Sequence, residues 1–311
     1  MTFETRSNTM ENVTDMFANN LNHLDYGSAD FEVAMKPLMF TSDTSFGVKL
    51  NEVKKRAIVR TDTEECLGVV GPHYNPVTHK EMINNQRAII SRSELNIRGI
   101  EENIITNTNG AKCFVRHTLP NQIIQTPDGD TAALTFLSTN SFDGSFSFIL
   151  SVGARQSACM NGQIFTNDSA TLYKSRHTRS LDIEKGARII TAGMEVMTKQ
   201  QELWDVWYNT PVDHDMIANI FAATLGLDIL DLDTTPYNKN WQFLWDIYND
   251  RYSPSMKNNL WAVYNALTHW ATHAPSQRKT SSMMNVTKLR TAQVAKVISD
   301  PEVFYRAKLV A

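Results

Sequence analysis

Apolar and polar positions follow two different patterns, which change near residue 180. Before it, short apolar runs alternate with turn residues. The runs predict three strands, at 111–118, 131–139 and 145–152. In the third, Phe146 and Phe148 lie two positions apart, as the period of a strand requires. Turn sequences at 126–129 and 141–144 separate the runs, so we expect a three-stranded antiparallel meander.

An earlier stretch, residues 56–71, predicts two more strands around a polar turn at 61–65. A helix follows. Thr78 is a suitable N-cap, and Glu81 three positions later completes a capping-box pattern before a run of apolar residues. With this hairpin, the predicted sheet has about five strands, a common size.

Beyond residue 180, apolar positions recur every three or four residues, which is the helical period. The predicted helices cover 181–208, 212–225, 238–248, 256–273 and 289–298. Pro254 and Pro275 flank the fourth, because proline is excluded from helix interiors. Between the last two helices, residues 274–285 predict an exposed loop.

The fold class predicted from this order is α+β: an antiparallel sheet of about five strands (hairpin, helix, meander) packed with a long helix and a C-terminal helical subdomain. We expect an irregular N-terminal arm at 1–50, with a short helix near 13–24, that docks on the body or on a neighbouring subunit. The α+β core domain is expected at 51–208 and the helical subdomain at 209–311.

Composition narrows the class of protein. Of 311 residues, 42% are hydrophobic and 20% are charged, so the chain can build a sizeable core. The net charge of −3 means that any nucleic-acid binding must come from a local patch. Three cysteines, no signal peptide and no run long enough to span a bilayer predict a soluble intracellular protein.

Short catalytic motifs are absent. The sequence contains no Gly-x-x-x-x-Gly-Lys-Ser/Thr phosphate loop, no Gly-x-Gly-x-x-Gly, no Gly-x-Ser-x-Gly and no His-Glu-x-x-His. The absence of these motifs does not exclude catalysis, but it removes the simplest enzyme hypotheses. We expect a protein that works without ATP or a cofactor and has no catalytic residues.

Two groups of residues could form metal sites, and each also has a simpler structural explanation. Cys113, His117, Cys159 and His177 are the residue types of a zinc site. However, Cys113 and His117 would lie roughly 13 Å apart on one strand, so we favour packed cysteines and surface histidines. An acidic nuclease site would combine Asp143 with Glu64, Glu65 or Asp168. Because Asp-Gly is a common turn pair, we favour turn chemistry there.

Basic residues are the more suggestive group, because those on the predicted sheet and just after it can converge on one edge. They are Lys54, Lys55, Arg56, Arg60, Lys112, Arg116, Arg155, Lys174, Arg176 and Arg179. Convergent cations suit a phosphate backbone. The aromatic residues among them, Phe142, Phe146, Phe148, Phe165 and Tyr173, could stack on bases. The alternative, a solvated charged face over an aromatic core, stays open. The six tryptophans have helical spacings that favour core packing.

A family signature lies in the middle of the chain. Asn140–Gly144 followed by Arg155–Asn161 resembles the phage/plasmid-like family, a domain of unknown function, with Phe142 in place of the usual His. Further matches are Gly68–Gly71 with Tyr74, Lys112–Pro120, Arg176–Thr178 and Asn259–Thr268. The resemblance covers roughly residues 50–275. It implies a phage or plasmid origin and no settled activity.

The predicted layout is also similar, by analogy of fold, to the RecT/Red-beta class of phage single-strand annealing proteins. The analogy implies an oligomer, a ring or a filament, that binds single-stranded DNA in the cytoplasm of a bacterial host. The ten basic residues would contact phosphates. Asn140, Asp143, Gly144, Cys159 and Asn161 would be structural. The alternative hypotheses are a non-enzymatic protein that binds a host or phage protein, and a metal-dependent nuclease.

Overall fold

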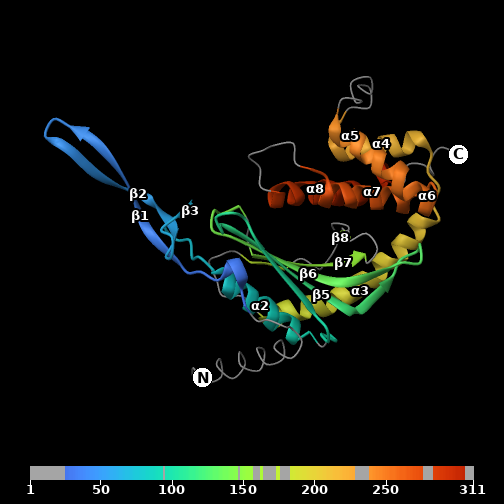
Figure 1. Cartoon of the computed structure of the whole chain (residues 1–311), viewed down its shortest axis with the longest axis horizontal. Coiled ribbons are helices and arrows are strands. Elements are labelled where there is room, and N and C mark those ends of the chain that lie inside the picture. Colours follow the sequence, from blue (N-terminus) through green and yellow to red (C-terminus); the bar gives the residue numbers. More distant parts are fainter. Residues whose placement is uncertain are drawn as a thin grey trace. The chain divides into compact units, whose positions relative to one another are not determined.

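The computed structural model describes residues 25–93, 95–145, 148–156, 162–163, 173–175, 183–227, 238–275 and 283–304. It has the predicted α+β composition, with helices and two sheets (Figure 1). The chain forms two compact units that alternate along the sequence. The first unit comprises 1–121, 135–152 and 171–192, and the second comprises 122–134, 153–170 and 193–311. The domain boundaries near residues 50 and 208 stay a prediction.

The first sheet belongs to the first unit and has the order β1-β2-β3. Its strands are β1 (Val33–Thr44), β2 (Gly47–Arg60) and β3 (Cys66–Val70). Two predictions were wrong here. The hairpin at 56–71 was expected to extend the meander sheet, but it pairs with β1 in a separate sheet. In the expected irregular arm, residues 33–44 are β1 and residues 47–50 begin β2, because the backbone groups of the two segments pair with each other across a turn at 45–46. The helix expected near 13–24 lies outside the described residues.

The second sheet has the order β4-β5-β6-β7-β8, with β9 paired to β7. The strands are β4 (Glu101–Thr106), β5 (Lys112–Gln125), β6 (Thr131–Ser141), β7 (Phe148–Gln156), β8 (Gly162–Gln163) and β9 (Tyr173–Ser175). β5, β6 and β7 correspond to the three predicted strands, with their ends shifted by several residues. β4 is an addition that the apolar pattern did not predict, and it pairs antiparallel with β5.

The helix α2 (His79–Ser91) supplies much of the core of the first unit. Its predicted start is confirmed, because the Thr78 hydroxyl accepts a hydrogen bond from the Glu81 amide at 3.0 Å. The predicted apolar positions Met82, Ile83, Ile89 and Ile90 are fully buried. A short 3-10 helix, η1 (Gly27–Ala29), precedes β1.

The helices of the C-terminal half also follow the predicted pattern. They are α3 (Ile183–Tyr208), α4 (His214–Leu225), α5 (Lys239–Ile247), the π-helical η3 (Tyr248–Tyr252), α6 (Ser253–Met256), α7 (Leu260–His273), α8 (Met283–Ile298) and α9 (Pro301–Phe304). α8 begins six residues earlier than predicted, so 283–285 of the expected loop are helical. Residues 276–282 of that loop lie outside the described part. Trp204, Trp207, Trp261 and Trp270 are buried, as core residues should be.

Candidate nucleic-acid interface

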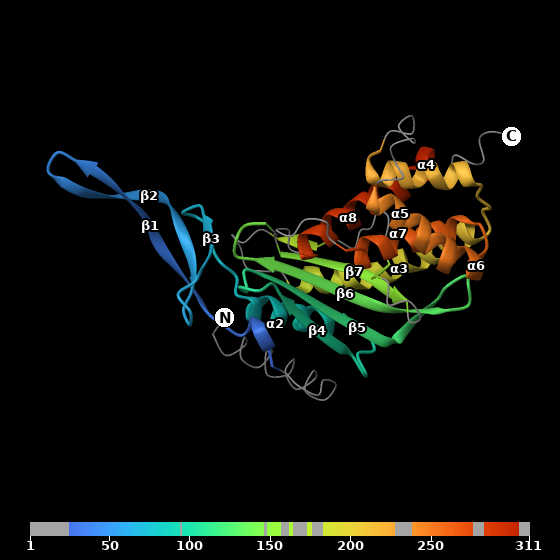
Figure 2. The same cartoon turned by 45° about the horizontal axis from the view of Figure 1, so that its top comes forward.

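The outer parts of β1 and β2 form a two-stranded ribbon that extends from the first sheet (Figures 1 and 2). The strands pair from Leu38–Val53 to Thr44–Gly47. β3 pairs with β2 between Arg56 and Val59, so it does not reach this outer part. None of the residues 38–55, which we call the ribbon, is buried. A hairpin that covers no core contributes little to folding, so its sequence is available for binding.

Large apolar side chains are exposed on the ribbon. Phe46, at the tip, is 100% exposed, and Phe40 is 54% exposed. Met39, Val48 and Leu50 are exposed by 47% to 68% of their surface. Such a concentration on one short element marks an interaction surface rather than ordinary surface composition.

Lys54 and Lys55 lie where the register between β1 and β2 shifts. Pro37 is opposite Arg56 and Leu38 is opposite Val53, so the two lysines have no residue opposite them. Both are exposed, as is Lys49 nearer the tip. Among the described ion pairs, none involves these three lysines. The ribbon therefore carries both exposed cations and exposed aromatic rings.

The other predicted phosphate contacts on the first sheet, Arg56 and Arg60, form ion pairs within the protein. Arg56 donates to the carboxylate of Glu52 at 2.6 Å. Arg60 forms an ion pair with Asp62 at 2.6 Å, and its guanidinium lies 3.9 Å from the ring centre of Phe31. These two arginines support the local structure and are less available to a ligand than Lys54 and Lys55.

On the second sheet, Lys112 is buried, and its Nζ lies 3.2 Å from Oδ2 of Asp143. Arg116 is half-buried on the same strand. Arg155 and Lys174 lie on β7 and β9, but their side chains are outside the described part, as are Arg176 and Arg179 entirely. The predicted convergence of all ten cations on one sheet edge stays a prediction.

The turn at 140–144, which carries the family signature, packs against β3. A Cβ atom on Gly68 would lie 2.6 Å from both the Phe142 carbonyl oxygen and the Asp143 Cα. Gly144 has a φ of +73°, and the carboxylate of Asp143 accepts from the Ser145 amide at 2.9 Å. Only glycine at position 68 permits this backbone approach.

Hydrogen bonds of Tyr74 and Asn140 connect the same turn to the segment that precedes α2. The Tyr74 hydroxyl donates to the Ser141 carbonyl at 3.0 Å. Burial and the Asp143 carboxylate raise the pKa of Tyr74 to about 12, so the hydroxyl keeps its proton. The amide of Asn140 donates to the Val77 carbonyl at 2.9 Å. These contacts make the turn a structural junction.

The His79 ring lies between the turn and the start of β5. Its Nδ1 is 3.0 Å from the Asn140 amide nitrogen, and its Nε2 is 2.7 Å from the Gly110 carbonyl. A ring with Nε2 protonated satisfies both contacts, since Nδ1 then accepts from the amide. Phe142, which replaces the usual His of the signature, packs on this ring with centres 4.4 Å apart. Cys159 and Asn161 of the signature lie outside the described residues.

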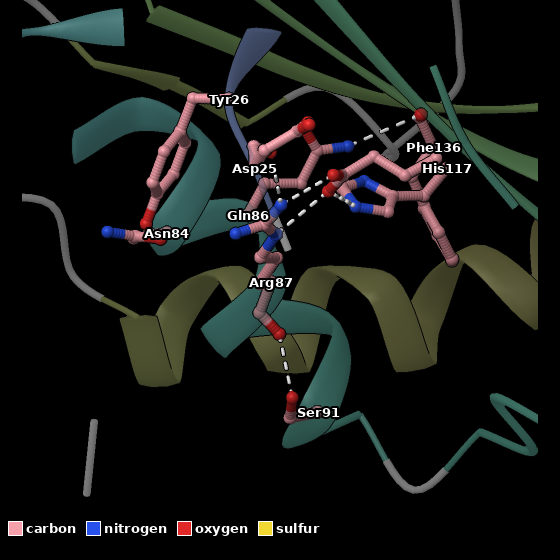
Figure 3. Close-up of polar contacts among 9 residues, drawn as sticks. Asp25, Tyr26, Asn84, Gln86, Arg87, Ser91, His117 and Phe136 are labelled. Atoms are coloured by element: carbon pink, nitrogen blue, oxygen red, sulfur yellow. Dashed lines mark hydrogen bonds and ion pairs between the residues drawn. The ribbon is translucent and has the colours of Figure 1, made fainter. Parts of the chain in front are cut away.

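Sequence reasoning missed a buried charged cluster on α2, β4 and β5 (Figure 3). The expectation that His117 is a surface histidine was wrong, because its side chain is fully buried against Glu102. Arg87 Nε donates to Glu102 at 2.8 Å, and His117 Nε2 donates to the same carboxylate at 2.6 Å. Gln86 donates to the Phe136 carbonyl at 3.3 Å beside them. Glu102 and His117 are directly opposite in the β4–β5 register, so recognising β4 would have revealed the pair.

The protonation states within this cluster follow from burial and pairing. Burial alone would raise the pKa of Glu102, but hydrogen bonds from His117 and Arg87 lower it to about 2. Burial and the nearby Arg87 charge lower the pKa of His117, and together they outweigh the raising effect of Glu102. The cluster is therefore one charged pair, Arg87 with Glu102, and a neutral imidazole that donates to the shared carboxylate.

Neither metal hypothesis has a site in the described residues. Among them, no group of three His, Cys, Asp or Glu side chains is placed to hold a metal ion. Burial raises the pKa of Cys113 to about 12, which disfavours a thiolate ligand. Cys159, His177 and Asp168 are outside the described part. Glu64 lies 3.3 Å from Lys36 rather than beside Asp143.

A family model described as Domain of unknown function (DUF932) matches residues 66–293. That range begins at β3 and contains Gly68, the signature turn and α7. No curated protein and no solved structure gives a significant match. Within the described part of the chain, none of the helices has the length and apolar composition that crossing a membrane requires.

Proposed function

The chain belongs to the DUF932 family, whose description assigns no activity, and we propose that it binds single-stranded DNA through the ribbon. The observation that supports the proposal best is that Lys54 and Lys55 are exposed and have no residue opposite them in the β1–β2 register, on the same ribbon as the exposed rings of Phe40 and Phe46. Proteins that bind single strands without reading sequence combine cations for the backbone with aromatic rings for the bases.

The lysines would supply the electrostatic part of the affinity. Each phosphate that they neutralise releases condensed counterions, which makes binding weaken as salt rises. Lysine suits this role because its ammonium is a mobile point charge that tolerates a flexible backbone. The overall charge of −3 does not attract DNA, so the attraction to the phosphate backbone must come from the local cations.

Phe46 and Phe40 would supply stacking. The tip ring of Phe46 is 100% exposed and can reach a base without any rearrangement of the sheet. Stacking on an aromatic side chain is worth about 1–3 kcal/mol per base and is tolerant of sequence.

Beyond binding, we propose that the protein pairs complementary strands without ATP, as an oligomer, in the cytoplasm of a bacterial host. The support is the analogy with phage annealing proteins and the absence of a phosphate loop from the sequence. In this proposal the protein is encoded by a phage or a plasmid.

The lysine assignment is tested by the double variant Lys54→Ala with Lys55→Ala. Fluorescence anisotropy with a labelled single-stranded oligonucleotide is measured across a salt series. Loss of two phosphate contacts should reduce the slope of log K against log salt by about 1.4. The matched control is Lys199→Ala with Lys239→Ala, two exposed lysines far along the chain, which should leave the slope unchanged. An unchanged slope in the first variant would refute the assignment.

Stacking is separated from charge by Phe40→Ala with Phe46→Ala. This variant should bind more weakly at every salt concentration while keeping the wild-type salt slope, because no phosphate contact is removed. Affinity equal to that of the wild type would exclude these rings from the interface.

A second candidate function is binding to a host or phage protein. It is favoured by Met39, Val48 and Leu50, which make part of the ribbon apolar rather than cationic. It predicts that nuclease-treated host lysate yields a defined partner with the wild-type chain, and that Leu50→Lys abolishes the capture. A wild-type chain that binds DNA but retains no protein would reject it.

A further inference from the structure

Two histidines share one face at the end of α7, in the second unit and away from the ribbon residues in sequence. His269 and His273 are four positions apart, which places them one above the other on the helix. Their ring centres are 4.6 Å apart with planes tilted by 35°. His269 also contacts the rings of Phe243 and Tyr252, whereas His273 is exposed.

The hydrogen bonds of Thr272 fix which nitrogen of His273 carries the proton. Its hydroxyl donates to the Thr268 carbonyl at 2.7 Å. The same oxygen lies 2.7 Å from Nδ1 of His273 and, with its hydrogen already committed, accepts there. His273 therefore has its proton on Nδ1, which leaves the Nε2 lone pair available.

His269 has the corresponding arrangement. Its Nδ1 lies 3.0 Å from the hydroxyl of the buried Tyr252, and the direction of this hydrogen bond depends on the tautomer of the ring. In the tautomer with the proton on Nδ1, the ring donates to that hydroxyl and its Nε2 can bind a metal. An imidazole whose Nδ1–H is held by a neighbouring oxygen is the usual form of a histidine that binds metal through Nε2. His269 is half-buried and His273 is exposed, so ions can reach the pair from solvent.

We propose that His269 and His273 together bind one divalent transition-metal ion through their Nε2 atoms. Metal–nitrogen bonds of about 2.0–2.1 Å to a shared ion, at a right angle, would place the ring centres about 4.5 Å apart. The observed 4.6 Å fits that arrangement. A right angle between two imidazole ligands suits the tetragonal geometry of Cu²⁺ and Ni²⁺ better than the tetrahedral geometry of Zn²⁺, and binding should be tightest for Cu²⁺.

Arg251 is the charged group that acts on both rings. Its positive charge also repels a dication, which limits the affinity.

Within the described residues, no third His, Cys, Asp or Glu joins the pair. The remaining coordination positions would hold water or groups from another molecule. An open site of this kind exchanges its ion readily, unlike a closed structural zinc site. The proposal is independent of DNA binding, because it involves none of the ribbon residues.

The test is calorimetric titration of the full-length chain with NiCl₂ at pH 7. We expect one ion per chain, and His273→Ala should weaken binding at least ten-fold. His273 is exposed, so its loss should leave the fold intact. His214→Ala, which removes an exposed histidine from another helix, is the matched control and should bind as the wild type does. Absence of binding by the wild type, or equal affinity in His273→Ala, would overturn the proposal.

Two further variants distinguish a built site from a chance pair of rings. Tyr252→Phe removes the acceptor for the His269 proton and should weaken binding about ten-fold. Arg251→Ala removes a repelling charge and should tighten it. With CuCl₂, electron paramagnetic resonance should show two nitrogen ligands in the wild type and one in His273→Ala. A spectrum that is the same in both would contradict coordination by this pair.

Discussion

Gly68 is the residue at which the signature turn comes closest to β3. A side chain there would meet the backbone of residues 142 and 143 at 2.6 Å, and backbone atoms cannot rotate away. Gly68→Ala should therefore lower the free energy of unfolding by about 1–3 kcal/mol, the usual cost of overpacking. Urea denaturation measures it. Gly71→Ala is the matched control, because a Cβ at position 71 meets nothing within 4 Å. Equal stability of the two variants would contradict this packing.

Glu102 is the residue on which the buried charged cluster depends. Glu102→Gln leaves the Arg87 guanidinium buried without its counter-charge, which typically costs about 3–5 kcal/mol. Glu101→Gln, at the neighbouring exposed position of β4, should cost almost nothing. Thermal or urea denaturation of the two variants would test this. A small effect at Glu102 would mean that water reaches the cluster.

The same residue predicts how stability depends on pH. The pKa of Glu102 is lowered from 4.5 to about 2 by folding, so the unfolded chain binds its proton first as pH falls. Its stabilising contribution is complete above pH 4.5 and is lost as pH falls toward about 2. Urea midpoints of the wild type should fall across this range more steeply than those of Glu102→Gln. Parallel curves would show that other carboxylates dominate.

At the residue scale, local chemistry was predictable and long-range partners were not. The Asp143–Gly144 turn and the Thr78 cap follow from preferences of neighbouring residues. The contact of Gly68 with that turn, and the pairing of Glu102 with His117, join residues far apart in sequence. Nothing in a single sequence marks such partners, because each depends on the fold being known first.

The ribbon is the element whose removal best separates folding from binding. Replacing residues 39–52 by Asn-Gly keeps the Leu38–Val53 pair and closes it with a favoured two-residue turn. Because no residue of the ribbon is buried, stability should change by less than about 0.5 kcal/mol. Binding to single-stranded DNA should weaken strongly, because Phe40, Phe46 and Lys49 are removed while Lys54 and Lys55 remain. Circular dichroism melting and anisotropy check the two parts, and a shortened chain that binds as tightly as the wild type would place the stacking part of the interface elsewhere.

Elements with one buried face were predictable, and exposed strands were not. α2 and α3 follow from apolar residues at helical spacing. β1 was not predicted because its apolar residues lie on both faces of the strand. Leu38 and Phe40 lie on one face and Met39 on the other, so the apolar pattern has no period of two. β4 has only two apolar residues, Ile104 and Ile105, in its six. The candidate interface was missed in part for this reason, since Phe40 and Phe46 lie in the expected irregular arm.

At the scale of the whole molecule, the annealing proposal requires several chains on one strand of DNA. The mass of one chain is 35.2 kDa. Light scattering with long single-stranded DNA should show complexes of many chains, larger than those formed with an oligonucleotide that fits only one. A complex that stays at one chain per strand would leave DNA binding possible but would contradict annealing by an oligomer.

The most direct test of the central claim is a salt titration of the wild-type chain with a labelled single-stranded oligonucleotide, followed by anisotropy. The ribbon account predicts binding at low salt that weakens linearly with log salt, with a slope of at least about 1.4 in magnitude for two lysine contacts. Absence of binding at low salt, by a chain with a normal cooperative melt, would contradict the account and favour a protein partner for the ribbon.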